Sequence, residues 1–201
     1  MRVKGPVLVA LALGLAPSAG LAQRVEISPF GGFQFGGDLN VDGGDLNIPL
    51  GGNYGILVDV TFASNGQIEL IYNRQATKLE QEGSGTPLFD LAVHNVHIGA
   101  LYRFPATQVS PFVTVSGGVT RLEPSGDREA ASYASGSFGG GLKKFITPNF
   151  GFRVQSRFWF TLVRSNDNAF CAPPAAGGCL VGQNAGLLVQ GNLTGGLIVA
   201  F

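Results

Sequence analysis

The last segment of the chain, Leu187 to Phe201, alternates between two kinds of side chain and ends in an aromatic residue. One set of alternate positions carries leucine, valine, glycine and the terminal phenylalanine, while the other set includes Gln190, Asn192 and Thr194. This period of two predicts a β-strand, because successive side chains of a strand point to opposite faces. A strand with one apolar and one polar face is typical of a barrel that contacts lipid outside and encloses a polar interior.

The start of the chain has the pattern of a secretory signal peptide. Met1 to Lys4 supplies two cations, Val7 to Ala16 is a short apolar run, and small residues lead up to Ala22. We expect cleavage after Ala22, which makes residues 1–22 a signal peptide and residues 23–201 one mature domain. The alternative, a retained transmembrane helix, needs about 20 apolar residues, and the run is shorter. No later stretch is long enough either, so membrane insertion of the mature chain would use strands.

The composition disfavours a soluble helical enzyme and a nucleic-acid partner. Charged residues make up 13% of the chain, about half of the share found in soluble domains. Glycine accounts for 31 of the 201 residues, roughly twice its usual share. Lys and Arg together number 13, as do Asp and Glu, so the formal net charge is zero. A chain without excess positive charge has no electrostatic support for binding nucleic acid.

Period-two patterning recurs along the mature chain and predicts eight strands. Such a chain is expected to have an all-β fold, an eight-stranded antiparallel up-and-down transmembrane β-barrel. The predicted strands are Val25–Phe35, Asn53–Phe62, Gln67–Thr77, Leu91–Phe104, Pro111–Leu122, Ala134–Phe145, Phe150–Val163 and Leu187–Phe201.

The predicted connections between these strands alternate between long and short. In an up-and-down meander every second connection lies at the same end, so we expect the short turns and both termini together at one end. The Asn65-Gly66 pair in the first short turn is a typical hairpin signal. The short connections are 63–66, 105–110 and 146–149, and the long ones are 36–52, 78–90, 123–132 and 164–185.

A soluble eight-stranded barrel of the lipocalin kind is the alternative fold, and it differs in which face is apolar. Alternation alone does not say which face points outward, but the placement of aromatic residues does. Tyr54 and Phe62 stand at the two ends of an apolar stripe on one strand. On another strand Phe150, Phe152, Phe158 and Phe160 share one side. Aromatic residues at both ends of an apolar stripe indicate the girdles of a membrane barrel.

The chain resembles the small eight-stranded outer-membrane barrels of the OmpA and OmpX type over residues 23–201. The resemblance lies in the leader, the alternating loop lengths, the stretch NFGFRVQSRFWF and the ending LTGGLIVAF. It implies a monomer in the bacterial outer membrane, surrounded by outer-membrane lipid. It also implies that the barrel assembly machinery recognises the final strand, at the positions matched here by Leu197, Val199 and Phe201.

The interior of an eight-stranded barrel is only wide enough for side chains to fill, so an open channel is not expected. The polar face of the predicted strands carries both carboxylates and cations, and these could pair as a network that plugs the lumen. A narrow pore for small solutes or ions is the alternative. The predicted interior charges are Glu26, Asp59, Glu69, Arg103, Lys143, Arg153 and Arg157.

The two histidines argue against an enzyme. His94 and His97 are three residues apart on a strand, so they point to opposite faces and cannot form a ligand pair. We expect His94 to face outward and His97 to face the lumen beside Asn95. The resemblance raises lipid deacylation or acyl transfer as a possible activity, which needs a nucleophile close to a histidine. A serine two residues beyond His94 would suit that role, but Val96 occupies the position.

Two connections contain further candidate sites. Cys171 and Cys179 lie in one proline- and glycine-rich stretch, and in an exported chain they are expected to form a disulfide. No His, Asp or Glu lies between them, so zinc is not expected. The first long connection begins like a calcium-binding loop, with Asp38, Asn40, Asp42 and Asp45, but Pro49 stands where such loops need glutamate. A solvated loop without calcium is therefore the preferred interpretation, and no cofactor is expected.

These patterns predict a fold and a location more firmly than an activity. The leading hypothesis is a barrel with a role in envelope integrity or surface interaction, carried out by its long loops. A narrow pore is the second hypothesis, and a lipid-modifying enzyme is the third.

Overall fold

In the computed structural model, the described residues are 24–41, 44–81, 87–105, 108–126, 130–163 and 186–201. Their regular structure consists of β-strands, and they include no helix long and apolar enough to span a membrane. The strands are β1 (Val25–Phe35), β2 (Asp38–Val41), β3 (Gly44–Asn47), β4 (Gly51–Thr61), β5 (Gly66–Gln81), β6 (Pro87–Arg103), β7 (Ser110–Pro124), β8 (Ala131–Thr147), β9 (Phe150–Val163) and β10 (Gly186–Ala200).

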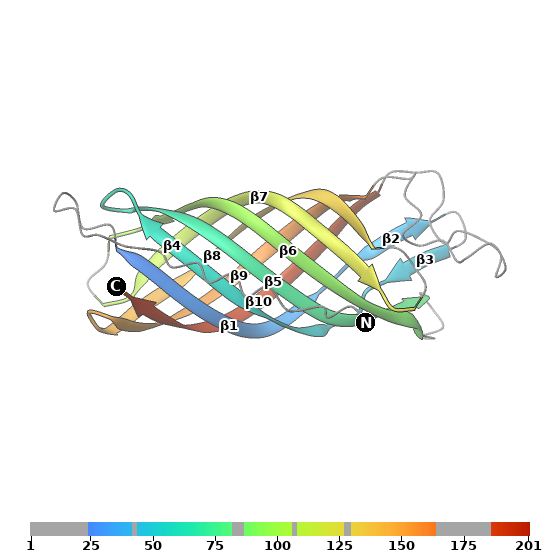
Figure 1. The fold of residues 1–201 in the computed structure, drawn as a ribbon, viewed down its shortest axis with the longest axis horizontal. Helices are drawn as coiled ribbons and strands as arrows, with labels where there is room; N and C mark the ends of the chain where they lie inside the picture. The colour runs from blue at the N-terminus through green and yellow to red at the C-terminus, as the bar shows by residue number, and fades with distance from the viewer. Residues whose placement is uncertain (1–23, 42–43, 82–86, 106–107, 127–129, 164–185) are drawn as a thin grey trace, which may run out of the picture.

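The eight long strands, β1 and β4 to β10, close into a barrel. Each pairs antiparallel with its neighbours along the chain, β1 pairs with β10, and β5 pairs with β6 to complete the ring. Figure 1 shows these strands tilted around one common axis. The predicted eight-stranded antiparallel up-and-down barrel is confirmed.

The short turns lie together at one end of the barrel, as the alternating connection lengths predict. The connections β4–β5, β6–β7 and β8–β9 meet at the end where β1 begins and β10 finishes (Figure 1). There the backbone N–H of Phe201 donates to the Val25 carbonyl oxygen at 2.9 Å. We call this the turn end, and the opposite end, where β2 and β3 lie, the loop end.

Three of the expected long loops contain strand that the sequence did not predict. In 123–132 the difference is small, because β7 ends at Pro124 and β8 begins at Ala131. The segment 36–52 includes an antiparallel hairpin, β2 and β3, which pairs with β5 through Leu46–Gln81 and Asn47–Glu80. Strand β5 continues to Gln81 and strand β6 already begins at Pro87. Most of the expected loop 78–90 is therefore paired backbone. Hydropathy alternation marks only those parts of a strand whose two faces meet different surroundings. Backbone pairing does not need that difference and extends past it.

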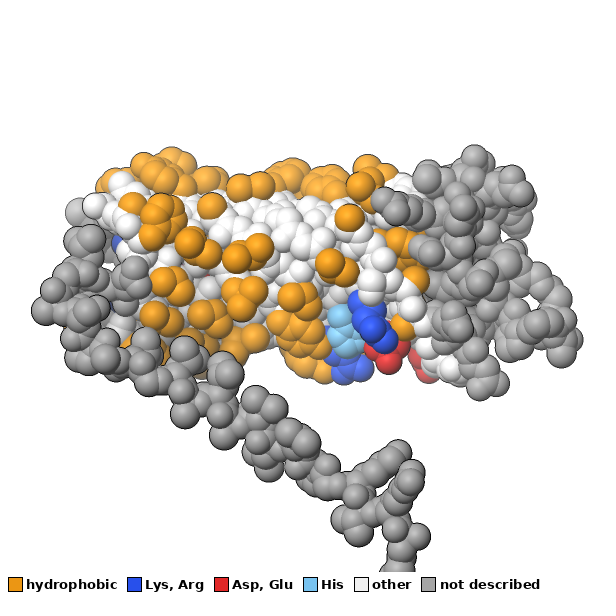
Figure 2. All heavy atoms as spheres, turned by 45° about the horizontal axis from the view of Figure 1, so that its top comes forward, with side chains coloured by type: hydrophobic (Ala, Val, Ile, Leu, Met, Phe, Trp, Pro, Cys, Tyr) orange, Lys and Arg blue, Asp and Glu red, His pale blue; other side chains and the backbone are white. Residues whose placement is uncertain are grey.

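The outward face of the barrel is apolar and the inward face is polar. Outward positions expose large apolar side chains on every long strand, for example Phe33, Ile56, Leu70 and Ile98. Figure 2 shows such side chains over most of the visible wall. The interior instead contains buried Gln, Asn, Ser, Thr and charged side chains. This polarity is that of a membrane barrel and excludes the soluble-barrel alternative.

Exposed aromatic residues gather toward both ends of this apolar wall. They come from several strands around the ring, and they fit the two aromatic girdles expected at the lipid–water interfaces. Toward the turn end they are Phe62, Tyr102, Phe104, Phe150 and Phe201; toward the loop end they are Phe33, Phe35, Tyr54, Tyr72 and Phe158.

Candidate functional site

Two groups of polar side chains stand out on this scaffold, one in the lumen and one on the outer wall. The lumen group lies near the turn end, and strand register brings it together. Cross-strand pairing aligns Glu26 with Asp59 and Asp59 with Glu69, so three carboxylates lie side by side on β1, β4 and β5. Strands β8 and β9 supply the cations from the opposite side of the ring. The cations are Lys143, Arg153 and Arg157.

Lys143 uses its ammonium group to join two of the carboxylates. Its Nζ lies 2.8 Å from Glu26 Oε2 and 2.7 Å from Asp59 Oδ2. It also donates to Gln67 Oε1 at 2.8 Å. The side chains of Lys143, Glu26 and Asp59 are fully buried. An ammonium group has three donors, so this lumen position satisfies all of them.

Two arginines complete the ion-pair chain. Arg153 Nη1 lies 2.8 Å from Asp59 Oδ2, and its Nη2 lies 2.5 Å from Glu69 Oε2. Arg157 Nη2 lies 2.5 Å from the other Glu69 oxygen, which also accepts a hydrogen bond from Thr114. We call the six connected residues the lumen network. Its three anions and three cations balance, which removes the large cost of an unpaired charge in a low-dielectric interior.

Arg103, the seventh predicted interior charge, does not join the lumen network. It is the last residue of β6 and is only half-buried. Its backbone N–H donates to the Asn65 carbonyl oxygen in the neighbouring turn at 2.8 Å. Within the described part of the chain its side chain forms no ion pair with the network. Its alternate position on the strand predicts an inward side chain. Because Arg103 ends β6, however, it lies at the turn end of the barrel and not inside the lumen.

On the loop-end side of the network, further buried side chains occupy the lumen. Trp159 packs in an apolar cluster with Phe30, Leu57 and Ile71. His97 lies edge-on to Trp159, with Nδ1 at 3.1 Å from Ser116 Oγ and Nε2 at 2.7 Å from Ser135 Oγ. His97 therefore faces the lumen, as its position in the sequence predicts.

Toward the loop end the lumen contains a cluster of amides and then an apolar layer. Asn73 donates to Gln34 at 2.9 Å, Gln34 donates to Gln190 at 3.1 Å, and Gln190 donates to Gln75 at 3.0 Å. The apolar layer consists of buried side chains from several strands and from the β3–β4 connection. They include Ile48, Leu91, Val93, Leu122, Val163 and Leu188.

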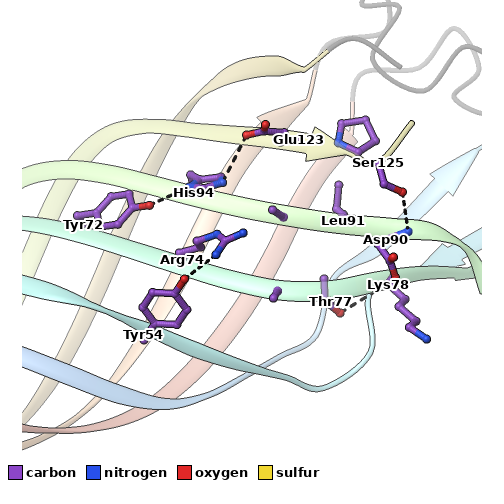
Figure 3. A pocket seen from close by; sticks show the side chains of 13 residues that line it. Tyr54, Tyr72, Arg74, Thr77, Lys78, Asp90, Leu91, His94, Glu123 and Ser125 are labelled. Carbon is purple, nitrogen blue, oxygen red and sulfur yellow. Dashed lines mark hydrogen bonds and ion pairs between the residues drawn. The ribbon is translucent and has the colours of Figure 1, made fainter. Parts of the chain in front are cut away.

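The second group lies on the outer wall toward the loop end, around His94. His94 points away from the lumen, with Nδ1 at 3.0 Å from the Tyr72 hydroxyl and Nε2 at 3.5 Å from Glu123 Oε2 (Figure 3). Tyr72 comes from β5 and Glu123 from β7, the two neighbours of β6. The outward side of His94 was predicted, but neither partner was. Tyr72 lies in a predicted strand, whereas Glu123 falls in an expected loop that the structure shows as the end of β7. The register that aligns them was not visible in the sequence.

The cross-strand register extends this group into a row. Tyr54, Arg74, His94 and Arg121 are successive cross-strand partners on β4, β5, β6 and β7. Arg74 Nη1 donates to the Tyr54 hydroxyl at 2.5 Å. On the loop side of the row lies an open hollow of about 840 Å³, whose lining includes Ala76 and Ala92. The short side chains of these alanines leave this part of the wall open. Figure 3 shows Arg74 and His94 on one side of the hollow and Thr77 and Asp90 on the other.

Several predicted site residues lie outside the described residues or are only partly described. Cys171, Cys179, Asp42 and residues 1–22 are outside them, and of Asp38, Asn40 and Asp45 only the backbone is described. Among the side chains that are described, no group of three or more His, Cys, Asp or Glu could hold a metal ion. The predicted assembly residues Leu197, Val199 and Phe201 all lie exposed on the outer side of the barrel.

Comparisons with known proteins agree with this architecture. Neisserial surface protein A matches with a TM-score of 0.60 and 14% identity, covering 89% of this chain and 97% of that chain. The outer membrane protein OprG from Pseudomonas aeruginosa matches with a TM-score of 0.55 and 13% identity, covering 88% and 95%. The attachment invasion locus protein of Yersinia pestis, solved with the heparin analogue sucrose octasulfate, matches with a TM-score of 0.50 and 16% identity. This match covers 89% of this chain and 99% of that chain.

At these identities the structural matches show the fold alone, and a comparison with curated protein sequences found no significant match. The sequence itself carries the family signal. A family model described as the outer membrane protein beta-barrel domain matches residues 7–172, which is most of the chain. The chain therefore belongs to the outer membrane protein beta-barrel family, and the protein lies in the bacterial outer membrane.

Proposed function

We propose that this protein is a plugged, non-conducting outer-membrane barrel that serves envelope integrity or surface interaction. The lumen network carries this proposal, because six buried charges form ion pairs across the tube instead of lining an open path. The apolar cluster around Trp159 and the apolar layer at the loop end add to the obstruction. The wall then acts as a rigid mount for the segments at the loop end.

The surface-interaction part of the proposal draws on the loop end. The end of β5, up to Gln81, and the start of β6, from Pro87, form a paired ribbon. The β2–β3 hairpin pairs with the β5 side of this ribbon. Such an extension gives a binding segment a defined position above the membrane. The attachment invasion locus protein of Yersinia pestis, which was solved with a heparin analogue, provides a precedent on a similar scaffold. We leave the ligand of this end unnamed.

Planar-bilayer recordings test the plug. We expect the purified protein to give no current steps, and the Glu69→Ala/Arg153→Ala double variant to raise ion flux because it removes paired charges and side-chain volume together. Glu123→Ala, on the outer wall, is the matched control and should leave the trace unchanged. Reproducible current steps from the unsubstituted protein would overturn the proposal.

A narrow pore is the second candidate, and one observation favours it. Along the β1–β10 side of the lumen, Ser28, Asn192 and Thr194 have buried polar atoms that lack a hydrogen-bond partner among the described residues. Buried polar groups of this kind are usually satisfied by internal water. A file of water along this wall would favour passage of small solutes, which the same recordings and a liposome-swelling assay would detect.

We infer no enzymatic role. The hydroxyl closest to His94 is the phenol of Tyr72, and Val96 occupies the position two residues beyond His94. Acyl transfer commonly uses a serine or cysteine activated by an adjacent base. His97 does have serine neighbours, Ser116 and Ser135, but it is buried in the lumen, away from the lipid. We expect that Ala substitution of His94 leaves the acylation pattern of outer-membrane lipids unchanged in mass spectra. A changed pattern would reopen the enzymatic hypothesis.

We further propose that the protein acts as a monomer and that the barrel assembly machinery recognises Leu197, Val199 and Phe201. These three side chains are accessible on the outer side of β10. A disulfide between Cys171 and Cys179 and removal of residues 1–22 also remain proposals. Mass spectrometry of the non-reduced protein purified from outer membranes tests both, because it gives the mature N-terminus and the two thiol hydrogens lost on oxidation.

A further inference from the structure

The outer wall carries charged side chains in an area where a lipid-facing barrel should be apolar or aromatic. Arg74, His94 and Arg121 stand side by side on three adjacent strands, in one row with Tyr54. One step toward the turn end, the corresponding positions are Tyr72, Val96 and Val119, all exposed. The row therefore lies directly on the edge of the apolar band, within the loop-end aromatic girdle. Figure 2 shows this cluster of charged and histidine side chains at that end of the wall.

The rest of the wall shows that this cluster is local. On β9 and β10 the outward positions remain apolar up to the loop end, with Phe158, Leu162, Leu187 and Val189 all exposed. At the loop end, the sector formed by β5 to β7 thus carries Arg74, His94 and Arg121 at outward positions, whereas β9 and β10 carry apolar residues there. A ring of charges around the whole barrel would simply mark where water begins, whereas a single sector indicates a specific contact.

Arg74 has no anionic partner among the described residues, which indicates that this sector is open to an external anion. Its guanidinium donates to the Tyr54 hydroxyl, a neutral group, and it forms no ion pair within the described residues. Its Nε is buried and has no hydrogen-bond partner there. Arg74 and Arg121 stand on either side of His94, so two guanidinium groups share a short stretch of wall and favour an anion beside them.

The hollow next to the row has room for such an anion. Its volume of about 840 Å³ far exceeds that of a single small ion, and its lining combines Arg74, His94 and Lys78 with Tyr54 and Tyr72. Asp90 and Glu123 also line it. Glu123 lies 3.5 Å from His94 and 3.9 Å from Arg121, so it already neutralises part of the row. Asp90 is the cross-strand partner of Lys78, so Arg74 is the cation of this lining that has no carboxylate opposite it.

We propose that this hollow binds the phosphorylated headgroup of an outer-leaflet lipid. Arg74 lines the hollow and contacts the phosphate, since a guanidinium matches phosphate oxygens in a two-pronged geometry. Arg121, beyond His94 in the row, adds positive charge beside the hollow. The Tyr54 and Tyr72 hydroxyls supply neutral hydrogen bonds. The acyl chains then continue along the exposed Tyr72–Val96–Val119 step and the apolar wall beyond it. This continuity with the apolar band is why we assign a lipid instead of free phosphate.

Native mass spectrometry in detergent tests the proposal, with the bisphosphorylated glycolipid lipid A as probe. We expect the unsubstituted protein to retain lipid A and to retain diacylglycerol, which has no phosphate, only weakly. Arg74→Gln/Arg121→Gln should weaken lipid A binding by about tenfold or more, because it removes two charged donors. The single variants should fall between. Lys144→Gln, an outward cation at the turn end of β8, is the matched control and should bind as the unsubstituted protein does.

Glu123→Gln gives a readout in the opposite direction. Removing this carboxylate takes a negative charge away from the hollow and frees Arg121, so lipid A binding should strengthen, and the gain should shrink as salt is added. Each variant is first checked for the folded barrel by heat-modifiable gel migration.

Three results would overturn the proposal. Equal lipid A binding by the double Arg variant and Lys144→Gln would remove the row from recognition. Equal retention of diacylglycerol would show that acyl chains alone adhere to the wall. Displacement of lipid A by inorganic phosphate at matching concentration would assign the hollow to the free ion.

Discussion

Glu69 forms two ion pairs in the lumen network, one through each carboxylate oxygen. Its two oxygens receive Arg153 and Arg157, each at 2.5 Å, inside a fully buried environment. Glu69→Gln keeps the shape of the side chain but leaves two guanidinium groups with one carboxylate fewer. Breaking a buried ion pair in this way costs about 3–5 kcal/mol. Urea unfolding of the refolded barrel in detergent should show a loss of this size.

Glu123→Gln is the matched control for that loss, because Glu123 also has two cationic partners but on the exposed wall. Exposed ion pairs contribute about 1 kcal/mol or less. The two variants should therefore differ clearly in unfolding midpoint. Equal midpoints would mean that the lumen network contributes no more stability than a surface pair.

Parity along a strand predicts on which side a residue lies, and the structure buries six of the seven predicted lumen charges inside the barrel. It does not predict which residues on neighbouring strands meet. Tyr72, Arg74 and Glu123 were therefore missed as partners of His94, although each lies at an outward position. Register depends on turn geometry and on the stagger of the whole barrel, which are not local properties of any one strand.

At the scale of the strand, the contact between β6 and β7 depends on a glycine. A methyl group added at Gly118 would collide with the Val96 carbonyl oxygen and lie 2.7 Å from the His97 Cα. Gly118→Ala should therefore push β7 away from β6 and lower the unfolding free energy by about 1–3 kcal/mol. Unfolding in urea measures this change.

The neighbouring Gly117 is the control within the same strand. A methyl group added there would meet nothing closer than the Ser135 carbonyl oxygen at 4.0 Å. Gly117→Ala should change stability by about 0.5 kcal/mol or less, as is usual for exposed substitutions. If both variants unfold alike, the close approach of β6 to β7 is not what requires glycine at Gly118.

The final strand allows assembly and stability to be separated. Phe201 is 72% exposed, so its side chain contributes little packing, while its backbone pairs with Val25. We expect Phe201→Ser to reduce accumulation in the outer membrane of cells but to refold in detergent as efficiently as the unsubstituted chain. Phe62→Ser, exposed at the same end, should affect neither. Poor refolding of Phe201→Ser in detergent would contradict a recognition role.

At the scale of the whole molecule, closure of the sheet gives every long strand two partners. The β2–β3 hairpin stands apart from this ring, because its register with the barrel consists of Leu46–Gln81 and Asn47–Glu80. The ring has no free edge from which unfolding can begin, whereas the hairpin can open without breaking it. The protein should therefore behave as one cooperative barrel with a separately opening hairpin.

Hydrogen–deuterium exchange in detergent micelles tests this division. Backbone amides in the central parts of β1 and β4 to β10 should exchange together and slowly, since their exchange requires opening of the ring. Amides of β2 and β3 should exchange faster by about two orders of magnitude or more, because local opening of the hairpin is sufficient. The Gly118→Ala variant should accelerate the ring amides as a group and leave the hairpin rates unchanged. Acceleration confined to β6 and β7 would show instead that the strands open individually and that closure does not make the barrel one unit.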